Sequence, residues 1–294
     1  MRRLIINADG CGFTFGNNRA IARVLEQGAI RSVSVNANFP AAEEAADMAR
    51  RFPEVSFGIH WNLSVGPPVS EPSRVRTLVE ENGQFVNEHL PKRAFLGQLS
   101  AVEMRLELEA QLSRLRSYGL NPTHWDSHQH RHVLPGFFAA AVEVAKTGGI
   151  RAARSTSYYL VMRPPRGLRL LGHFVERPNR VASHLLARSR SRSLAREGFV
   201  VPDFHVGIRS FGEGAEHDPQ AWAYLFSVLP RGIGSIAVHP GYPDETLKRY
   251  SSMIGSRERE VELFEDFRVG RLAKDAGVEL IGFNELLAGE MGAP

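Results

Sequence analysis

The chain has 294 residues, of which 43% are apolar and 23% are charged, and its formal net charge is +4 at neutral pH. These values are ordinary for a soluble globular protein. No apolar run approaches the roughly 20 residues of a membrane-spanning helix, and the N-terminal segment turns polar too early for a signal peptide. The single cysteine, Cys11, excludes an intramolecular disulfide and favours a reducing cytoplasm as the compartment.

Apolar runs alternate with amphipathic patterns along the chain. Short buried or alternating runs predict strands at 3–8, 33–39, 55–63, 122–126, 150–154, 234–239 and 278–283. Apolar residues repeating on one face predict helices at 17–27, 41–51, 101–118, 137–146 and 257–276, with a short helix opening at 284–287. Strands and helices that alternate in this way predict a mostly parallel sheet.

Polar candidate residues follow at least four of the predicted strands. Because a barrel brings the carboxyl ends of its strands to one mouth, we expect a single irregular (β/α) barrel of the α/β class rather than a doubly wound sheet. No internal repeat and no clear linker divides residues 1–294, so we expect one domain, with an arginine-rich insertion around 163–198.

The arginine-rich insertion holds seven further arginines between Arg163 and Arg196, against one glutamate, Glu176. A solvated helical face is the plainest interpretation. The alternative is a surface for an anionic carrier of the substrate, such as a nucleotide-linked sugar or a lipid headgroup. Nucleic acid is disfavoured because the segment lacks interleaved aromatic residues for stacking on bases.

The densest group of chemically active residues lies at 123–135, which holds four of the eleven histidines. His128, His130 and His132 alternate, so in extended backbone they would share one face. Imidazole is the commonest metal ligand among side chains, and Asp126 is placed to be the carboxylate that fixes the tautomer of such a ligand.

Other predicted strands end in residues of similar chemistry. Asp9 closes the first strand and His60 the third, although a turn aspartate or a structural histidine would fit these positions too. His239, ahead of a Pro-Gly turn, can protonate a leaving amine as a general acid. Arg154 can orient a carboxylate or steady negative charge, or it forms a surface salt bridge.

No motif for a nucleophilic side chain competes with this group. The chain has no G-x-S-x-G elbow, and Cys11 has no adjacent base in the sequence. The glycines at 10, 12 and 16 miss the G-x-G-x-x-G spacing of a phosphate-binding turn by one residue. The chemistry on offer is therefore a water activated by a divalent metal.

Four ordered segments resemble the YdjC-like carbohydrate deacetylases, a family that includes chitooligosaccharide and hopanoid-associated sugar deacetylases. They are Asn7-Ala8-Asp9 with Gly12, Gly58-Ile59-His60-Trp61-Asn62-Leu63, Thr123-His124-Trp125-Asp126-Ser127-His128-Gln129-His130, and His239-Pro240-Gly241. The resemblance implies a barrel related to polysaccharide deacetylases that hydrolyses an N-acetyl group on a sugar. It also implies that His60 and His128 bind the metal and that His239 is the acid.

The chain departs from this family at one position. The family has a paired Asp-Asp after the first strand, which supplies a general base and a metal ligand, and here the pair reads Asp9-Gly10. Asp9 can bind the metal itself, with Asp126 or a water as base, or the two histidines hold the metal with more water and Asp9 stays the base. Two further interpretations are that Cys11 is a third metal ligand and that the chain has lost catalysis. Loss of a charged ligand makes Zn²⁺ at least as strongly expected as Mg²⁺.

The sequence therefore predicts a metal-dependent hydrolase that removes the N-acetyl group from an aminosugar or a sugar conjugate, with Zn²⁺ or Mg²⁺ as its ion. The residues expected to contact the substrate are Arg154, Trp61, His130 and Tyr242. The first alternative is an amidohydrolase acting on a non-sugar amide, which is disfavoured because its H-x-H motif belongs on the first strand. The second is a degenerate sugar-binding protein. The sequence leaves open whether the chain forms a homodimer. Neither a nucleic acid partner nor a membrane span is expected.

Overall fold

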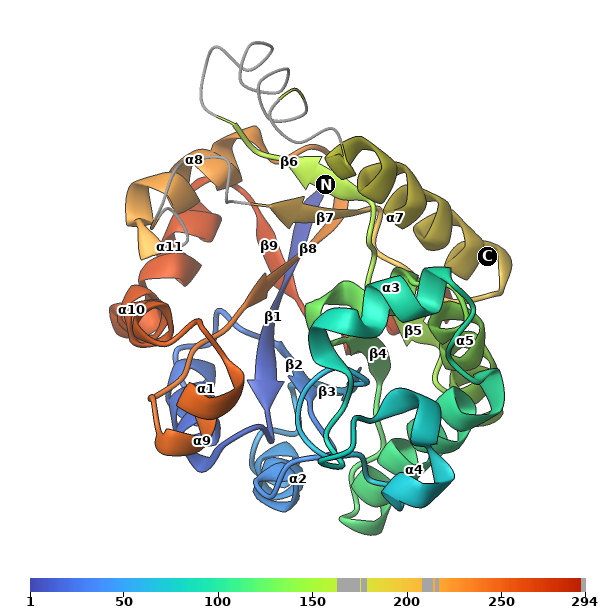
Figure 1. The fold of residues 1–294 in the computed structure, drawn as a ribbon. Helices are drawn as coiled ribbons and strands as arrows, with labels where there is room; N and C mark the ends of the chain where they lie inside the picture. Colours follow the sequence, from blue (N-terminus) through green and yellow to red (C-terminus); the bar gives the residue numbers. More distant parts are fainter. Residues whose placement is uncertain (163–174, 176–178, 208–213, 215–216, 292–294) are drawn as a thin grey trace.

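The computed structural model describes residues 1–162, 175, 179–207, 214 and 217–291. Its strands form a parallel sheet in the order β5-β4-β3-β2-β1-β8-β7-β6, with β9 beside β1 (Figure 1). The strands are β1 (Arg2–Cys11), β2 (Ser32–Val35), β3 (Ser56–Trp61), β4 (His124–Ser127), β5 (Ala152–Ala153), β6 (Tyr158–Leu160), β7 (Phe204–Gly207), β8 (Gly232–Val238) and β9 (Glu279–Ile281).

The sheet curls on itself with helices around its outer face, and the strands β5 and β6 are the two ends of its hydrogen-bonded path (Figure 1). The predicted α/β class and irregular barrel are therefore confirmed. Strand β1 is central, because Arg2–Ala8 pairs with β8 on one side while Asn7–Cys11 pairs with β2 on the other. The first part of β1 pairs with β9 instead of β2.

Helices follow most of the strands and return the chain to the start of the sheet. They are α1 (Phe15–Leu25), α2 (Ala42–Arg51), α3 (Leu90–Phe95), α4 (Ala101–Ser117), α5 (Phe137–Thr147), α7 (Asn179–Arg196), α8 (Pro219–Val228), α9 (Glu245–Tyr250), α10 (Gly255–Phe264), α11 (Arg268–Asp275) and α12 (Phe283–Met291). Short 3₁₀ turns are η1 (Pro72–Arg74), η2 (Arg76–Leu78), η3 (Asn87–His89), η4 (His128–Val133) and η7 (Glu265–Phe267). No helix within the described ranges is long and apolar enough to cross a membrane.

The second half of the chain differs most from the sequence prediction. The single helix expected at 257–276 is wrong, since α10 and α11 are separated by Asp266 and Phe267, whose φ values of 56° and 55° lie in the left-handed region. The short strands β6 and β7 were not predicted. The predicted insertion is a helix, α7, from residue 179 onward, while 163–174 and 176–178 lie outside the described residues.

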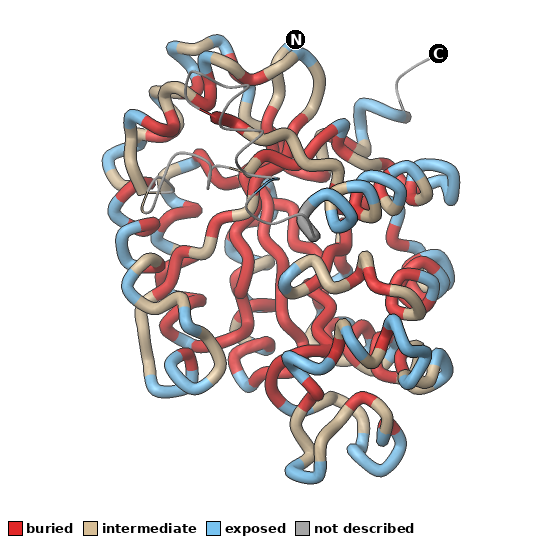
Figure 2. Tube along the Cα trace, turned by 45° about the horizontal axis from the view of Figure 1, so that its top comes forward, coloured by how far each residue is buried: buried red, intermediate tan, exposed pale blue. Residues whose placement is uncertain are grey.

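Side chains alternate between two environments along the strands, as the period of two in a strand requires. Leu4, Ile6 and Ala8 of β1 belong to the main hydrophobic core. Asn7 lies between Ile6 and Ala8, and Asp9 follows Ala8. Both are buried polar residues that face the inside of the barrel. Buried segments concentrate along the strands and exposed ones along the outer helices (Figure 2). The inside of the barrel therefore holds a polar group of side chains at the carboxyl ends of its strands.

Candidate active site

Three side chains from three strands meet inside the barrel. Asp9 lies on β1, His60 on β3 and Asp126 on β4, and all three are buried. One ligand atom from each lies within 4.8 Å of those of the other two, which makes this the group that could hold a metal ion among the residues that the structure describes. The strand ends thus converge as the barrel prediction required.

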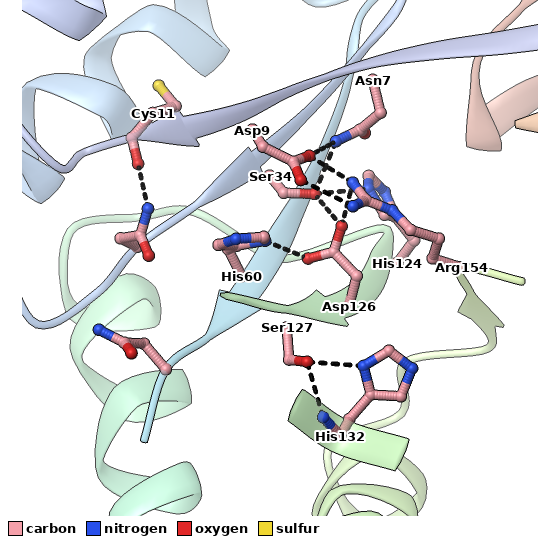
Figure 3. Close-up of polar contacts among 12 residues, drawn as sticks. Asn7, Asp9, Cys11, Ser34, His60, His124, Asp126, Ser127, His132 and Arg154 are labelled. Carbon is pink, nitrogen blue, oxygen red and sulfur yellow. Dashed lines mark hydrogen bonds and ion pairs between the residues drawn. The ribbon is translucent and has the colours of Figure 1, made fainter. Parts of the chain in front are cut away.

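His60 is fixed in orientation by Asp126 (Figure 3). Its Nδ1 lies 2.5 Å from Asp126 Oδ1, and Ser34 Oγ donates a hydrogen bond to Asp126 Oδ2 at 2.8 Å. With Nδ1 bound to a carboxylate, the remaining ring nitrogen, Nε2, is the one suited to a metal ion. This carboxylate–histidine arrangement is typical of metal ligands in proteins.

Arg154 lies just after β5 and pairs with both carboxylates (Figure 3). Its Nη1 donates to Asp9 Oδ2 at 2.7 Å, and its Nη2 contacts Asp9 Oδ1 and Asp126 Oδ2. Arg154 is only 1% exposed, so this is a buried charge held by opposite charges. Arg154 therefore orients two carboxylates inside the barrel, in line with one of its two expected roles, and the alternative of a surface salt bridge is wrong.

The charges set the protonation of both carboxyl groups. Burial alone would raise the pKa of Asp9, but the charge and hydrogen bonds of Arg154 outweigh it and hold that pKa well below its usual range. Burial opposes ionisation of Asp126 too, and Arg154 and His60 together lower its pKa to about 2. Both carboxylates are therefore ionised at neutral pH. Two negative charges face one guanidinium, and the excess negative charge favours a further cation.

Two more histidines flank this group. The ring of His128 lies 5.7 Å from that of His60, centroid to centroid, at an angle of 80°. His239, after β8, has its Nε2 4.0 Å from Asp9 Oδ2 and is 28% exposed. Burial is the main cause that lowers the pKa of each of these two histidines to about 3, so both rings are neutral at pH 7. Neutral imidazole is the form that binds metals.

A layer of polar contacts beneath the site keeps its strands in place. His124 is fully buried, stacks on Phe283 with centroids 3.8 Å apart, and lies 3.3 Å from Ser34 Oγ. A Cβ added at Gly58 would come within 2.5 Å of the His124 ring, so this position of β3 has room for glycine alone. The close approach of β3 and β4 that brings His60 to Asp126 depends on this glycine.

Gly10 lies where the register of β1 against β2 shifts, between Asp9 and Cys11. Its φ of +91° favours glycine, and an added Cβ would lie 3.3 Å from Asn17 Nδ2 and 3.5 Å from Arg257 Nη1. A side chain at position 10 would therefore point toward a guanidinium at the rim of the site. Arg257 is close enough to His128 and His239 for its charge to help lower their pKa values.

A family model described as YdjC-like protein matches residues 3–275 of the chain. The chain belongs to the YdjC-like family. The resemblance inferred from the sequence motifs is thereby confirmed.

Proteins named carbohydrate deacetylase match this YdjC-like chain along most of its length. It is 32% identical over 290 residues to a carbohydrate deacetylase from Geobacillus stearothermophilus, a match that covers 97% of this chain and 98% of that protein. A carbohydrate deacetylase from Homo sapiens is 32% identical over 252 residues, covering 82% of this chain and 75% of the relative. A solved structure from Enterococcus faecalis V583, provisionally named a cellobiose-phosphate cleavage protein, matches with a TM-score of 0.77 at 21% identity and covers 97% of this chain and 98% of its own. That structural match shows the shared fold.

The YdjC-like site gathers some of the sequence candidates and leaves others elsewhere. Trp61 is fully buried in the hydrophobic core, 5.1 Å from Trp125 between ring centroids, away from the polar inside of the barrel. Tyr242 packs partly on that core and its backbone N–H donates to Gly16 O at 3.4 Å. The thiol of Cys11 is buried, and burial raises its pKa, which disfavours the thiolate that a metal would need.

The prediction that His128, His130 and His132 share one face is wrong. Residues 128–133 form the 3₁₀ turn η4, in which Gln129 and His130 both have φ near 54°, so the rings diverge. His128 faces His60, whereas His132 Nδ1 lies 2.6 Å from Ser127 Oγ. His130 lies against a different histidine, His205.

Sequence reasoning assigned no role to the residues that support the site from β1 and β2. Asn7 Nδ2 donates to Asp9 Oδ1 at 2.7 Å and to Ser34 Oγ at 3.0 Å. The Ser-Val-Ser-Val pattern of β2 carried the signal, because Val33 and Val35 lie in the core while the two serines face inward. A strand that buries serine on one face and valine on the other indicates a polar interior on the serine side.

The Gly10 departure yields a testable prediction. Gly10→Ala should lower the free energy of unfolding by about 1–2 kcal/mol, because a side chain is strained at this φ. Gly10→Asp carries the same backbone strain but restores the carboxylate that the family resemblance assigns to the metal site, so we expect Zn²⁺ to raise its melting temperature more than that of Gly10→Ala. Thermal unfolding of both variants with and without Zn²⁺ measures this. If Zn²⁺ raises the melting temperatures of both variants equally, the view that the metal site lacks a protein ligand at position 10 is contradicted.

Proposed function

We propose that this protein is a metal-dependent carbohydrate deacetylase that hydrolyses the N-acetyl group of an aminosugar or of a sugar conjugate. The observation that carries the proposal is the convergence of Asp9, His60 and Asp126 within 4.8 Å inside the barrel. Membership of a family whose relatives are named carbohydrate deacetylases supports the substrate class. The non-sugar amidohydrolase has no comparable support.

The residues present fit a divalent metal. A metal bound to an imidazole nitrogen lies about 3 Å from the ring centre, so two histidines sharing it have centres about 5–6 Å apart. The rings of His60 and His128 are 5.7 Å apart. We therefore assign these two histidines as the protein ligands, with the Asp9 carboxylate within reach of the same ion. Such an ion, zinc or magnesium, would supply an activated water and polarise the amide carbonyl.

The chain's own residues then divide the work of hydrolysis. Arg154 holds both oxygens of Asp9, which keeps that carboxylate ionised and aimed, so Asp9 accepts the proton from the attacking water. The water oxygen bonds to the carbonyl carbon, the C–N bond breaks, and the leaving nitrogen takes a proton. The lowered pKa of His239 favours its neutral form, and its Nε2 lies 4.0 Å from Asp9 Oδ2, so His239 can pass on the proton that Asp9 received. Asp126 orients His60 and takes no proton.

The metal proposal predicts the behaviour of two variants. His60→Ala and His128→Ala should each lose bound metal and lower acetate release by at least about 10²-fold, because each removes one of two imidazole ligands. Metal analysis of the purified proteins and acetate release from a panel of N-acetylated sugars, with added Zn²⁺ or Mg²⁺, measure both effects. His89→Ala, on the exposed turn η3, is the matched control and should equal the wild type. Metal retained in full by both variants would overturn the assignment.

A degenerate sugar-binding protein is the second candidate, and Gly10 is the observation that favours it. The missing family carboxylate would weaken the metal site while the barrel and its polar interior persist. The same assay separates the two candidates. Sugar binding without acetate release at saturating Zn²⁺ identifies the binding protein, and acetate release identifies the enzyme.

The cytoplasm remains our proposed compartment, since Cys11 is the only cysteine and it is buried and unpaired with another thiol. An anionic carrier for the sugar remains a proposal based on the exposed Arg188, Arg192 and Arg196 of α7. Binding of a nucleotide-linked N-acetylated sugar more tightly than of the free sugar, with the difference lost at high salt, would support it.

A further inference from the structure

A second group of polar rings lies inside the barrel near β6, the last strand in the order of the sheet. Tyr158 on β6 and His205 on β7 are register partners, with ring centroids 5.4 Å apart. His130 of η4 completes the group, 5.1 Å from His205 and 5.9 Å from Tyr158. None of these three side chains belongs to the Asp9, His60 and Asp126 group.

The three rings are held in place from outside. His205 is 4% exposed, and its Nδ1 lies 3.0 Å from Ser235 Oγ on β8. His130 and the residue before it both adopt left-handed backbone, which residues other than glycine rarely do. Such strain persists where the surrounding structure requires it, and it concentrates at ligand-binding sites. Because of this strained turn, the ring of His130 faces His205, whereas the ring of His128 faces His60.

Two imidazole nitrogens beside this group lack a partner. His130 Nδ1 and His132 Nε2 are buried without a hydrogen bond, and His132 is fully buried with its ring 6.4 Å from that of His130. Buried polar atoms in folded proteins are nearly always hydrogen-bonded, to protein, water or ligand. The hydroxyl groups of a ligand, like water, can satisfy these nitrogens.

The chemistry of the group suits an uncharged partner. Burial, together with the charges of His130 and Arg154, holds the pKa of His205 well below its usual range, so that ring is neutral. A neutral imidazole offers one donor and one acceptor, and a phenol can do both, as a sugar hydroxyl can. Arg154, the nearby cation, is already bound to Asp9 and Asp126. An anionic group would find no free positive charge among these residues.

The group also lies beside the proposed metal site. His130 is two residues after His128 on η4, and the ring of His128 is 5.7 Å from that of His60. A ligand against these rings would therefore adjoin the place where the amide reacts.

We propose that His130, His205 and Tyr158 form a subsite that binds the hydroxyl groups of an uncharged sugar ring and so determines substrate specificity. The inference rests on the proposed deacetylase function, because the bound ring is the one that carries the N-acetyl group.

The test uses two conservative variants. Tyr158→Phe removes one hydroxyl group, and His205→Asn keeps an atom near Nδ1 for Ser235 while removing the far end of the ring. We expect each to raise KM for N-acetylglucosamine about tenfold with kcat within about threefold of the wild type, the pattern for lost binding that is equal in ground and transition states. The ratio of kcat/KM for N-acetylglucosamine to that for 4-nitrophenyl acetate, which has no ring hydroxyls, should fall about tenfold. His89→Asn on the exposed η3 turn is the control and should keep the wild-type ratio.

Two results would overturn the subsite. Equal losses on both substrates would assign the rings a structural role, and unchanged KM in both variants would mean that the sugar does not bind against these rings. If the wild type releases no acetate at all, the deacetylase proposal fails. Saturation-transfer NMR with N-acetylglucosamine then decides the subsite alone: binding that both variants weaken supports it, and an absence of binding to the wild type refutes it.

Discussion

Replacing Asp9 with asparagine is expected to lower kcat for acetate release by about 10²–10⁴-fold, the range that a general base contributes. Asparagine keeps the size of the side chain but cannot take the proton of the attacking water. Its amide nitrogen also faces the donors of Arg154, which now hold both Asp9 oxygens. KM should change little, because the proton transfer occurs only in the transition state. Steady-state acetate release measures both constants.

The metal content of the Asp9→Asn protein separates the two roles open to this carboxylate. If Asp9 is the base, the variant should bind the ion as the wild type does; if Asp9 is a ligand, the ion should be lost together with activity. Asp47→Asn is the control, since Asp47 is an exposed carboxylate on α2 that pairs with Arg50. A kcat within about tenfold of the wild type would place the base elsewhere.

The convergence of the site residues could be predicted because it follows from topology. Parallel strands with intervening helices place their carboxyl ends together, so Asp9, His60 and Asp126 had to lie near one another once the barrel was inferred. The same alternation could have excluded Trp61 as a contact for the substrate. If His60 faces the inside of the barrel, its neighbour on the strand faces the helices, and Trp61 indeed packs on Trp125.

The pairing of Arg154 could not be predicted, because nothing in one sequence says which acid a lone arginine will meet. The turn at 128–133 was unpredictable for a different reason. Gln129 and His130 adopt a left-handed backbone without glycine or asparagine to signal it, so tertiary contacts override the local preference. The break between α10 and α11 at Asp266 and Phe267 has the same origin. Local sequence fails where the surrounding fold imposes strained backbone.

Arg154→Met is expected to lower the free energy of unfolding at pH 7 by about 3–5 kcal/mol, the cost of leaving buried charges without their partner. Methionine fills a similar volume but leaves the carboxylates of Asp9 and Asp126 facing each other in a buried site. Denaturant unfolding at pH 7 measures the loss. Arg105→Met is the matched control, because the ion pair of Arg105 with Glu143 is exposed, and it should leave stability unchanged.

The stability of the two proteins should respond to acid in opposite directions. As the pH falls, the wild type should lose the stabilisation that Arg154 gives, whereas the Arg154→Met variant should gain stability. In the wild type Arg154 helps to lower the pKa of Asp126 to about 2, below the 3.8 of a free carboxyl, so its contribution is present above pH 4 and lost as the pH falls toward 2. Without Arg154, burial and mutual repulsion raise both carboxyl pKa values, and protonation then relieves the buried charge. Relative to the wild type, the variant should therefore gain stability as the pH falls from 7 to 4. A difference between the two proteins that stays constant over that range would mean that Arg154 stabilises the barrel by packing and not by charge.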